Sequence, residues 1–343
     1  MEKINVVIAN ILNGLESRKK DVLINRFGLA SASKPMTLQA IGDKYGVTRE
    51  RIRQIESLAL ADARMAVAAS SEVNEILNEV NLYLTSKGGV SLENDLYDDM
   101  KNKLSGEVWL SHLSFLREAS KRFGYQPDNN HFYAFWYNND NALKKAKDFV
   151  IKFASVLKNK KEEVVTGGKF DSIFNDLTKV HTIDSNVGLN YLAVSKKFTV
   201  SPYGDRGLSV WPEVNPSTIR DWSYLVLKKA SKPLHFEEIA SHISSVHAKK
   251  KKVFTPTVHN ELIKDKRFVL VGRGMYGLTE FGYEIGNIKS LIKNTLSKHG
   301  KLPANKIIDL VSQQRMFKKN TILLHLQDKE MFKKDGKGDY LLA

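Results

Sequence analysis

The sequence predicts a mostly α-helical protein, in which a helix-turn-helix domain is followed by tandem winged-helix domains, each built of α-helices and a small β-hairpin. Three observations support this fold class. Two short helical segments near the N-terminus are joined by a tight turn that contains glycine. Two stretches near the C-terminus each combine three helical segments with two short strands. These two stretches also align with each other, which predicts a repeat.

The composition excludes several classes of protein. The 343 residues include no Cys, which excludes disulfides, cysteine zinc fingers, iron–sulfur clusters and thiol catalysis. No apolar run approaches the length of a membrane span, and the N-terminus lacks a secretion signal pattern. We therefore expect no membrane partner and a cytoplasmic, nucleoid-associated location.

The charge of the chain is strongly positive and unevenly distributed. The 53 Lys and Arg against 38 Asp and Glu give a net charge of +15. Residues 1–69 carry +4, residues 70–212 carry 0 and residues 213–343 carry +11. The neutral middle is the richest in aromatic residues, most densely over residues 131–137. This pattern favours an interaction body between nucleic-acid-binding ends, although solvated lysine faces would also produce the excess.

Element order and composition predict five domains. The first, residues 1–69, is the helix-turn-helix, and the two middle domains, residues 70–140 and 141–212, are winged-helix-like. The last two, residues 213–283 and 284–343, are a winged helix and its repeat. For the middle domains a helical bundle with similar loops is the alternative.

Apolar side chains at helical spacing predict an opening helix over residues 4–15 and a second over residues 18–27, which Gly28 ends. A loop rich in Ser and Ala follows. Thr37 then caps a helix over residues 38–45.

The next helix carries the candidate DNA-reading residues. Thr48 caps this helix, which runs to about Arg64. At 100° per residue, its polar side chains fall on one face and Ile52, Ile55 and Ala59 on the other. Arg suits guanine, Glu accepts from cytosine and Gln pairs with adenine, so one polar face can read bases in the major groove. An ordinary charged surface helix is the alternative. The base-reading candidates are Arg49, Glu50, Arg53 and Gln54.

Residues 8–64 resemble region 4 of the sigma-70 family. The resemblance rests on four motifs: Leu15–Leu23, Arg26–Leu29, Thr37–Gly42 and Gly46–Glu56. In that family the module reads the −35 promoter element and docks on the RNA polymerase β-flap. The resemblance therefore implies two partners, double-stranded DNA and RNA polymerase (its β-flap or core), and implies base reading at the four positions named above.

The chain also departs from the family. It begins at this module, so we expect the family's promoter-melting and −10-reading regions to be absent. The helix continues as Ser57–Arg64, with a single basic residue where the family is usually basic. This puts phosphate contacts at that end in doubt.

The middle of the chain predicts the same unit twice. The first copy has helices over residues 73–86, 92–103 and 109–123 before a strand pair around residues 129–130. The second has helices over residues 143–157, 170–177 and 186–198. It ends in a hairpin over residues 200–211, whose turn contains Gly204 and Gly207.

Residues 217–279 give the clearest winged-helix pattern. Helices are expected over residues 217–230 and 236–245, and a third is capped by Thr255 with Pro256 at its first position. Two short strands then surround Gly272–Gly274. This order predicts a winged helix-turn-helix.

The unit recurs at the end of the chain. At an offset of 64 residues, Val258, Phe268 and Tyr276 align with Ile322, Phe332 and Tyr340, and Leu234 aligns with Leu302 at an offset of 68. The first copy is four residues longer, in the loop that holds Lys249–Lys252. Gly272 and Gly274 align with Gly336 and Gly338, which predicts positive φ in both hairpin turns.

Residues 218–280 resemble the HARE-type helix-turn-helix, on the motifs at residues 233–240, 257–263 and 268–278. That domain is similar to the N-terminal domain of the δ subunit of bacterial RNA polymerase. Such domains bind DNA in some settings and polymerase in others, so the resemblance leaves the ligand open.

A second set of residues is placed to contact the DNA backbone or minor groove. The lysine run is a plausible phosphate contact beside a winged helix but is also typical of a solvated loop. Arg273, at a hairpin tip, can enter a minor groove or remain solvated. The set is Thr37, Thr48, Arg51, Lys249, Lys250, Lys251, Lys252, Thr257, His259, Asn260 and Arg273.

The sequence indicates no enzyme, and we expect no catalytic residue, cofactor, metal ion or small-molecule substrate. Gly272–Gly274 precedes no helix, so a wing turn is favoured over a phosphate-cradling loop. The closest group of histidines lacks a carboxylate in the Glu-x-x-His spacing of a metal site; it consists of His235, His242, His247 and His259. Asp95, Asp98 and Asp99 lie on an expected surface helix, where a nuclease centre is less favoured than solvation.

The preferred function is a DNA-binding transcription regulator that binds −35-like DNA, RNA polymerase or both, without melting the promoter. One alternative is an accessory RNA polymerase-binding subunit for which DNA contact is incidental. A third is the DNA-recognition component of a restriction or repair system.

Overall fold

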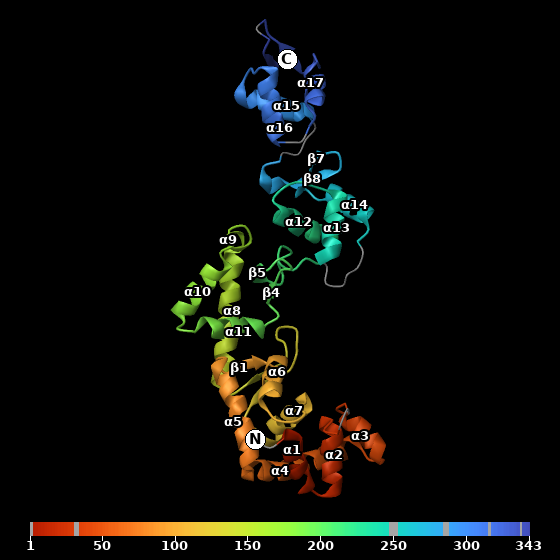
Figure 1. Ribbon diagram of the computed structural model, residues 1–343, viewed down its shortest axis with the longest axis vertical. Helices are drawn as coiled ribbons and strands as arrows, with labels where there is room; N and C mark the ends of the chain where they lie inside the picture. Colours follow the sequence, from red (N-terminus) through yellow and green to blue (C-terminus); the bar gives the residue numbers. More distant parts are fainter. Residues whose placement is uncertain (1–2, 31–33, 247–252, 284–287, 315–316, 337) are drawn as a thin grey trace. The chain divides into compact units, whose positions relative to one another are not determined.

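The computed structural model describes residues 3–30, 34–246, 253–283, 288–314, 317–336 and 338–343. It divides into two compact units, residues 1–198 and 199–343. The described residues are mostly helical, with small antiparallel sheets of two or three strands (Figure 1). The predicted fold class is therefore confirmed. The division into five domains stays a prediction.

The first four helices follow the expected pattern and are α1 (Ile4–Asn13), α2 (Ser17–Phe27), α3 (Leu38–Tyr45) and α4 (Arg49–Ala69). Gly28 and Gly46, at φ of 67° and 66°, end α2 and α3 in a left-handed conformation that glycine adopts without strain. Thr37 and Thr48 cap α3 and α4, because each hydroxyl accepts a backbone N–H three residues later, at 3.1 and 3.2 Å.

Helix α4 extends beyond the expected end at Arg64. Ala63 and Val67 are buried on its inner side, so packing supports the additional turn. On the other side of its first half, Ile52 and Ile55 form a small core with Val22 of α2 and Ile41 of α3. Two ion pairs also join α2 to α4: Lys19 to Asp62 at 2.8 Å and Arg26 to Glu56 at 2.9 Å.

The next segment contains α5 (Ser71–Ser86), β1 (Val90–Leu92), α6 (Glu93–Lys103), α7 (Leu110–Ser120), β2 (Gly124–Gln126) and β3 (Phe135–Tyr137). The predicted strand pair is present as β2 and β3. The sequence missed β1, which pairs antiparallel with β3 and gives the strand order β1-β3-β2. The expected helix from Leu92 therefore begins at Glu93, and the helix expected to reach Phe123 ends at Ser120.

Helix α7 joins this segment to the N-terminal helices. The ring of Phe115 meets that of Phe27 edge-on at 5.6 Å, and Arg64 Nε donates to the carbonyl oxygen of Ala119 at 3.3 Å. One hydrophobic core extends from Ile4 in α1 to Trp136 in β3. The helix-turn-helix thus has a small core of its own, and the inner side of α4 also packs into a larger core that it shares with the next segment.

An aromatic core organises the third segment, which contains α8 (Asp140–Asn159), α9 (Lys161–Val165), α10 (Phe170–Val180), α11 (Ser185–Ala193), β4 (Phe198–Val200) and β5 (Arg206–Leu208). Phe153 of α8 contacts Phe170 and Phe174 of α10 with centroids 5.3 and 5.6 Å apart. The sequence did not predict α9.

Two expectations for this segment were wrong. The helix expected to reach Phe198 ends at Ala193, because the chain turns there and Ser195 bridges to Phe132. Gly204, at φ of 93°, lies in the β4–β5 turn, whereas Gly207 lies within β5. A Cβ on Gly207 would meet Val214 at 2.7 Å, so close packing explains this glycine.

The first C-terminal copy contains α12 (Ile219–Ala230), β6 (Leu234–His235), α13 (Phe236–Val246), α14 (Thr255–Lys264), β7 (Phe268–Gly272) and β8 (Met275–Leu278). The three helices and the hairpin appear in the expected order. The sequence missed β6, which gives the strand order β6-β8-β7, the same as in β1-β3-β2. Thr255 is the first residue of α14 and not its cap, a position that Phe254 takes without a side-chain hydrogen bond.

The last copy contains α15 (Ile288–His299), α16 (Ala304–Gln314), α17 (Lys319–Leu326), β9 (Phe332–Lys334) and β10 (Tyr340–Leu342). Strand register supports the repeat. The pair Leu234–Tyr276 in the first copy corresponds to the bridge Leu302–Tyr340, and Phe268–Leu278 corresponds to Phe332–Leu342.

The shared glycines of the two hairpins differ in their conformation. Gly274 and Gly338 have φ of 70° and 94°, as expected. Gly272 and Gly336 are not in that region, so positive φ accounts for one glycine of each pair.

We expect the Phe115→Ala variant to lower the free energy of unfolding by about 3–5 kcal/mol, because a fully buried ring would leave a cavity between α7 and α2. Urea unfolding followed by circular dichroism measures the change. The exposed Leu82→Ala on α5 is the control and should change stability by less than about 0.5 kcal/mol. A similar small effect for both variants would contradict the shared core.

Acid should destabilise the same contact region through His112. This side chain is buried on α7, and its Nδ1 accepts from the backbone N–H of Trp109 at 3.4 Å. Burial lowers the pKa of His112 to about 4, against about 6.5 in an unfolded chain.

Between these values the unfolded state binds a proton that the folded state does not. We therefore expect the free energy of unfolding to fall by up to about 3 kcal/mol as the pH drops from 6.5 to 4. His112→Gln should flatten this part of the stability profile, whereas the exposed His131→Gln should leave it unchanged. Equal profiles for the two variants would exclude His112 as the cause.

Candidate nucleic-acid interface

Helix α3, a short turn and the first half of α4 form a helix-turn-helix. The turn is Gly46-Val47-Thr48, and Val47 N donates to Gly42 O at 3.0 Å. A Cβ on Gly42 would meet the carbonyl oxygen of Val47 at 2.6 Å. The absence of a side chain at Gly42 therefore lets the turn lie directly against α3 and sets the direction in which α4 leaves.

The first half of α4 presents one exposed polar face, which we call the polar face and define as Arg49, Glu50, Arg53, Gln54 and Ser57. Ile52, Ile55 and Ala59 are buried on the opposite side. The structure thus brings the four base-reading candidates together on a surface that a DNA groove can reach. Their role in base reading stays a prediction.

An ion pair organises the polar face. Arg53 Nη2 lies 2.7 Å from Glu50 Oε1, and Arg53 Nε lies 2.9 Å from Glu50 Oε2. The hydrogen bonds from Arg53 lower the pKa of Glu50, so the carboxylate is ionised. Gln54 Oε1 accepts from Arg51 Nη1 at 3.2 Å. DNA must therefore compete with contacts inside α4 for Arg53 and Gln54, whereas Arg49 pairs with no described acidic side chain.

The backbone-contact candidates lie in three places. Thr37, Thr48 and Arg51 are exposed beside the polar face, and the two threonine hydroxyls accept cap hydrogen bonds while keeping a proton to donate. Thr257 and Asn260 are exposed on α14, and Arg273 is exposed between β7 and β8. Lys249, Lys250, Lys251 and Lys252 lie outside the described residues.

The side chain of His259 is less accessible to a DNA phosphate than the sequence suggested. Its ring lies 4.6 Å from that of Phe236 and 5.9 Å from that of Tyr276, between α13 and β8. The side chain is half-buried in this aromatic cluster. Packing therefore accounts for His259, and a phosphate contact would need its outer edge.

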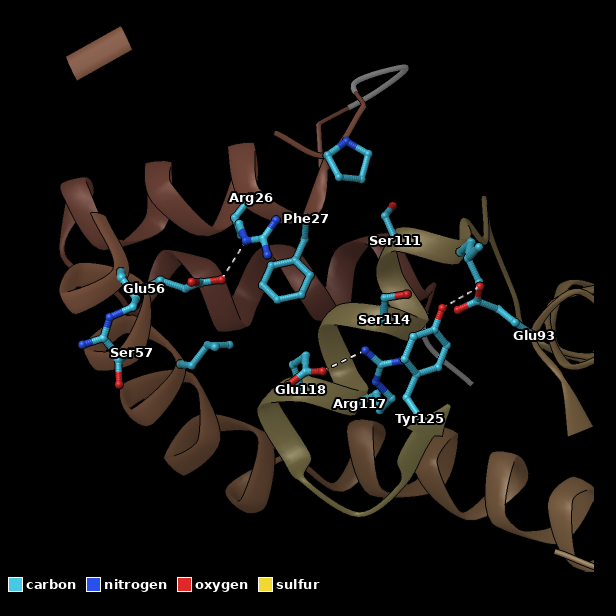
Figure 2. A pocket seen from close by; sticks show the side chains of 14 residues that line it. Arg26, Phe27, Glu56, Ser57, Glu93, Ser111, Ser114, Arg117, Glu118 and Tyr125 are labelled. Atoms are coloured by element: carbon cyan, nitrogen blue, oxygen red, sulfur yellow. Dashed lines mark hydrogen bonds and ion pairs between the residues drawn. The ribbon is translucent and has the colours of Figure 1, made fainter. Parts of the chain in front are cut away.

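A cleft of about 880 Å³ adjoins the polar face (Figure 2). Arg53 and Ser57 of the polar face line one side, and Ser111 and Ser114 of α7 line another. Its three arginines each pair with a glutamate, whereas Glu93 accepts hydrogen bonds from Tyr125 and Trp136. The cleft is lined by Arg26, Phe27, Pro35, Arg53, Glu56, Ser57, Leu60, Glu93, Leu110, Ser111, Ser114, Arg117, Glu118 and Tyr125.

Arg117 fixes the floor of this cleft. Its guanidinium lies 4.1 Å from the ring centroid of Tyr125 and 5.0 Å from that of Trp136, and it pairs with Glu118 at 2.8 Å. Glu93 accepts from Trp136 Nε1 at 3.2 Å. Sequence reasoning missed these residues, because only the fold brings α6, α7 and β3 together. Stacking of the Arg117 guanidinium on these two rings holds this part of the cleft in place beside Arg53.

Two features are absent from the described part of the chain. Among its residues, no group of three or more His, Asp or Glu is arranged to hold a metal ion. None of the described helices combines the length and the apolar character that crossing a bilayer requires.

Comparison with known proteins matches the N-terminal helices. Residues 11–64 match the family described as Sigma-70, region 4. The RNA polymerase sigma factor RpoD of Helicobacter pylori is 43% identical over 63 residues, which are 18% of this chain and 9% of that protein. The sigma factors SigA of Microcystis aeruginosa and Synechocystis sp. are each 47% identical over 57 residues, 17% of this chain and 14% and 13% of theirs. The chain thus spans about a tenth of the length of these relatives, and the matched segment holds the complete polar face.

We expect Arg49→Ala and Arg53→Ala each to weaken binding to a −35-like duplex by about 1–3 kcal/mol and to relax preference at one base pair. Fluorescence anisotropy against the element and a scrambled duplex measures both effects. The exposed Arg122→Ala, outside the polar face, is the control. Equal losses on the two duplexes would show that the arginines contact phosphates and do not read bases.

Proposed function

We propose that this protein is a DNA-binding transcription regulator related to sigma factors, which binds −35-like promoter DNA through α3 and α4 and associates with RNA polymerase. The observation that carries the proposal is that the exposed polar face lies within the segment that matches sigma-70 region 4. We place its action at the nucleoid in the cytoplasm.

The geometry supports base reading from the N-terminal half of α4. In helix-turn-helix proteins the second helix enters the major groove and its N-terminal side chains reach the base edges. Arg49 is available for the O6 and N7 of guanine. Arg53 and Glu50 form an ion pair within α4. On binding, this pair can separate so that Arg53 contacts a guanine and Glu50 contacts a cytosine on neighbouring base pairs. Thr37, Thr48 and Arg51 lie where they would contact the flanking phosphates.

In this proposal the protein binds promoter DNA but does not melt it. Its match with sigma factors lies in region 4, whereas promoter melting and −10 reading belong to other regions of that family. Binding to a promoter without melting would recruit polymerase, exclude it or alter its path. The sign of regulation depends on where the element lies.

A second candidate is an accessory RNA polymerase-binding subunit. Leu58 and Met65 are 57% and 69% exposed and lie seven residues apart on one side of α4, beyond the polar face. Exposed apolar side chains in such an arrangement favour a protein contact. The HARE-type resemblance of residues 218–280 also supports this candidate.

The two candidates differ in a reconstituted transcription assay. With core RNA polymerase and this protein as the sole specificity factor, we expect no run-off transcript from a linear promoter duplex but a footprint over a −35-like element. A complete sigma factor under the same conditions is the positive control. Specific run-off transcripts would overturn the proposal. Association with polymerase without a footprint, unchanged by Arg49→Ala, would favour the accessory subunit.

A further inference from the structure

The repeated units allow equivalent surfaces to be compared within one chain. The segments α5–β3 and α12–β8 share both the order of helices and strands and the strand order of their sheets. The last copy aligns with α12–β8 through its buried positions. Val258 and Leu262 correspond to Ile322 and Leu326, and all four are buried. The third helix of each unit, with the strand after it, therefore occupies an equivalent place.

In residues 1–198, α7 and α11, which are the last helices before a hairpin in the two middle segments, already bind other parts of the chain. Helix α7 is buried against α2 and α4 through Phe115 and its neighbours. Helix α11 binds the β1 region, where Asn190 Nδ2 donates to Val90 O at 2.7 Å and Tyr191 OH donates to Gly88 O at 2.8 Å. Helices α14 and α17, which precede the hairpins of the last two units, carry large exposed side chains, such as Ile263 and Leu324.

Helices α14 and α17 and the strands after them differ in the chemistry of their side chains. Phe254, which precedes α14, is 77% exposed, and Ile263 near its end is 62% exposed. On the following strand, Val269 is buried and Leu270 is 48% exposed. Phe254, Thr255, Val269 and Leu270 thus carry no charge, whereas Lys264 at the end of α14 and Lys266 after it are exposed cations.

At the equivalent positions the last copy carries lysines, 64 residues further on. Lys318 and Lys319 replace Phe254 and Thr255, and Lys333 and Lys334 replace Val269 and Leu270. We call these four residues the lysine group; all four are exposed. None of them forms an ion pair with a described acidic side chain.

Of the acidic residues that flank β9 in the sequence, Glu330 is exposed, whereas Asp328 and Asp335 are already engaged. Asp328 pairs with Lys289 of α15, and Asp335 pairs with Lys301 at 3.3 Å. The carboxylate of Asp335 also accepts the backbone N–H of Asp339. The carboxylates of Asp328 and Asp335 therefore have lysine partners outside the lysine group, and within the group Lys334 Nζ lies 5.7 Å from the ring centroid of Tyr340.

We propose that the last unit contacts the phosphate backbone of duplex nucleic acid through the lysine group. The charges are spread over the start of α17 and the strand β9, an arrangement that suits a polymer with phosphates along its length better than a single small anion. This site is separate from the polar face of α4 and adds sequence-independent affinity to the proposed DNA binding. It lies outside the first copy, where sequence reasoning placed the candidates of the C-terminal half.

The test uses the full chain with Arg49→Ala and Arg53→Ala, so that contacts by the polar face do not mask the effect. In this background the lysine group is changed to alanine, and affinity for a scrambled duplex is measured across a potassium chloride series. Each lost phosphate contact should reduce the slope of log K against log salt by about 0.9, and the affinity at low salt should fall at least ~10-fold.

The matched control changes four other exposed lysines of the same compact unit, Lys264, Lys266, Lys293 and Lys298, and so alters the net charge equally. The proposal expects a clearly smaller change in slope for the control. Equal slopes for the two fourfold variants, or no change from the lysine group, would overturn it, as would a preference for acidic protein over duplex in competition. Because specific binding by α4 is measured separately with Arg49 and Arg53 intact, failure of one site is distinguishable from failure of the other.

Discussion

The contact of α7 with α2 and α4 is the interaction on which the N-terminal half depends. Phe115 is fully buried there against Phe27, and the core around it extends from α1 to β3. An isolated helix-turn-helix of this size would bury little apolar surface and be marginally stable. By covering the inner side of α4, α7 stabilises it as a 21-residue helix and fixes the direction of its polar face.

This arrangement has a consequence for binding. The face of α4 opposite the polar face is used by the protein itself, so ligands reach α4 from the polar side or along Leu58 and Met65. The arginines of the cleft beside Arg53 pair with glutamates, and Arg117 is stacked on two aromatic rings. These contacts in the cleft keep the polar face in one orientation, which reduces the free-energy cost of ordering its side chains on DNA.

The repeated units show how one topology can serve different contacts. Their buried positions are retained, because each unit needs the same few apolar side chains to hold three helices against a hairpin. Their exposed positions are free to differ. In α7 these positions bind a neighbouring helix, whereas the uncharged Phe254 and Leu270 of the first copy are replaced by lysines in the last copy. Fold similarity among the units therefore does not imply a shared ligand.

The sequence by itself determined the local structure. Helical periodicity, the caps at Thr37 and Thr48 and the glycines at 28 and 46 set the N-terminal helices, because these signals act within a few residues. The offset of 64 residues gave the repeat, and the polar face followed from a period of 3.6. Short strands such as β1 and β6 escaped prediction, since two or three residues form a strand only when a distant partner, β3 or β8, supplies the hydrogen bonds. Only the tertiary structure decided that the helix-turn-helix shares its core with the next segment, that Arg117 and Glu93 meet beside Arg53, and that His259 packs within an aromatic cluster. Those outcomes depend on contacts between residues far apart in the chain, and local patterns do not encode which surfaces will meet.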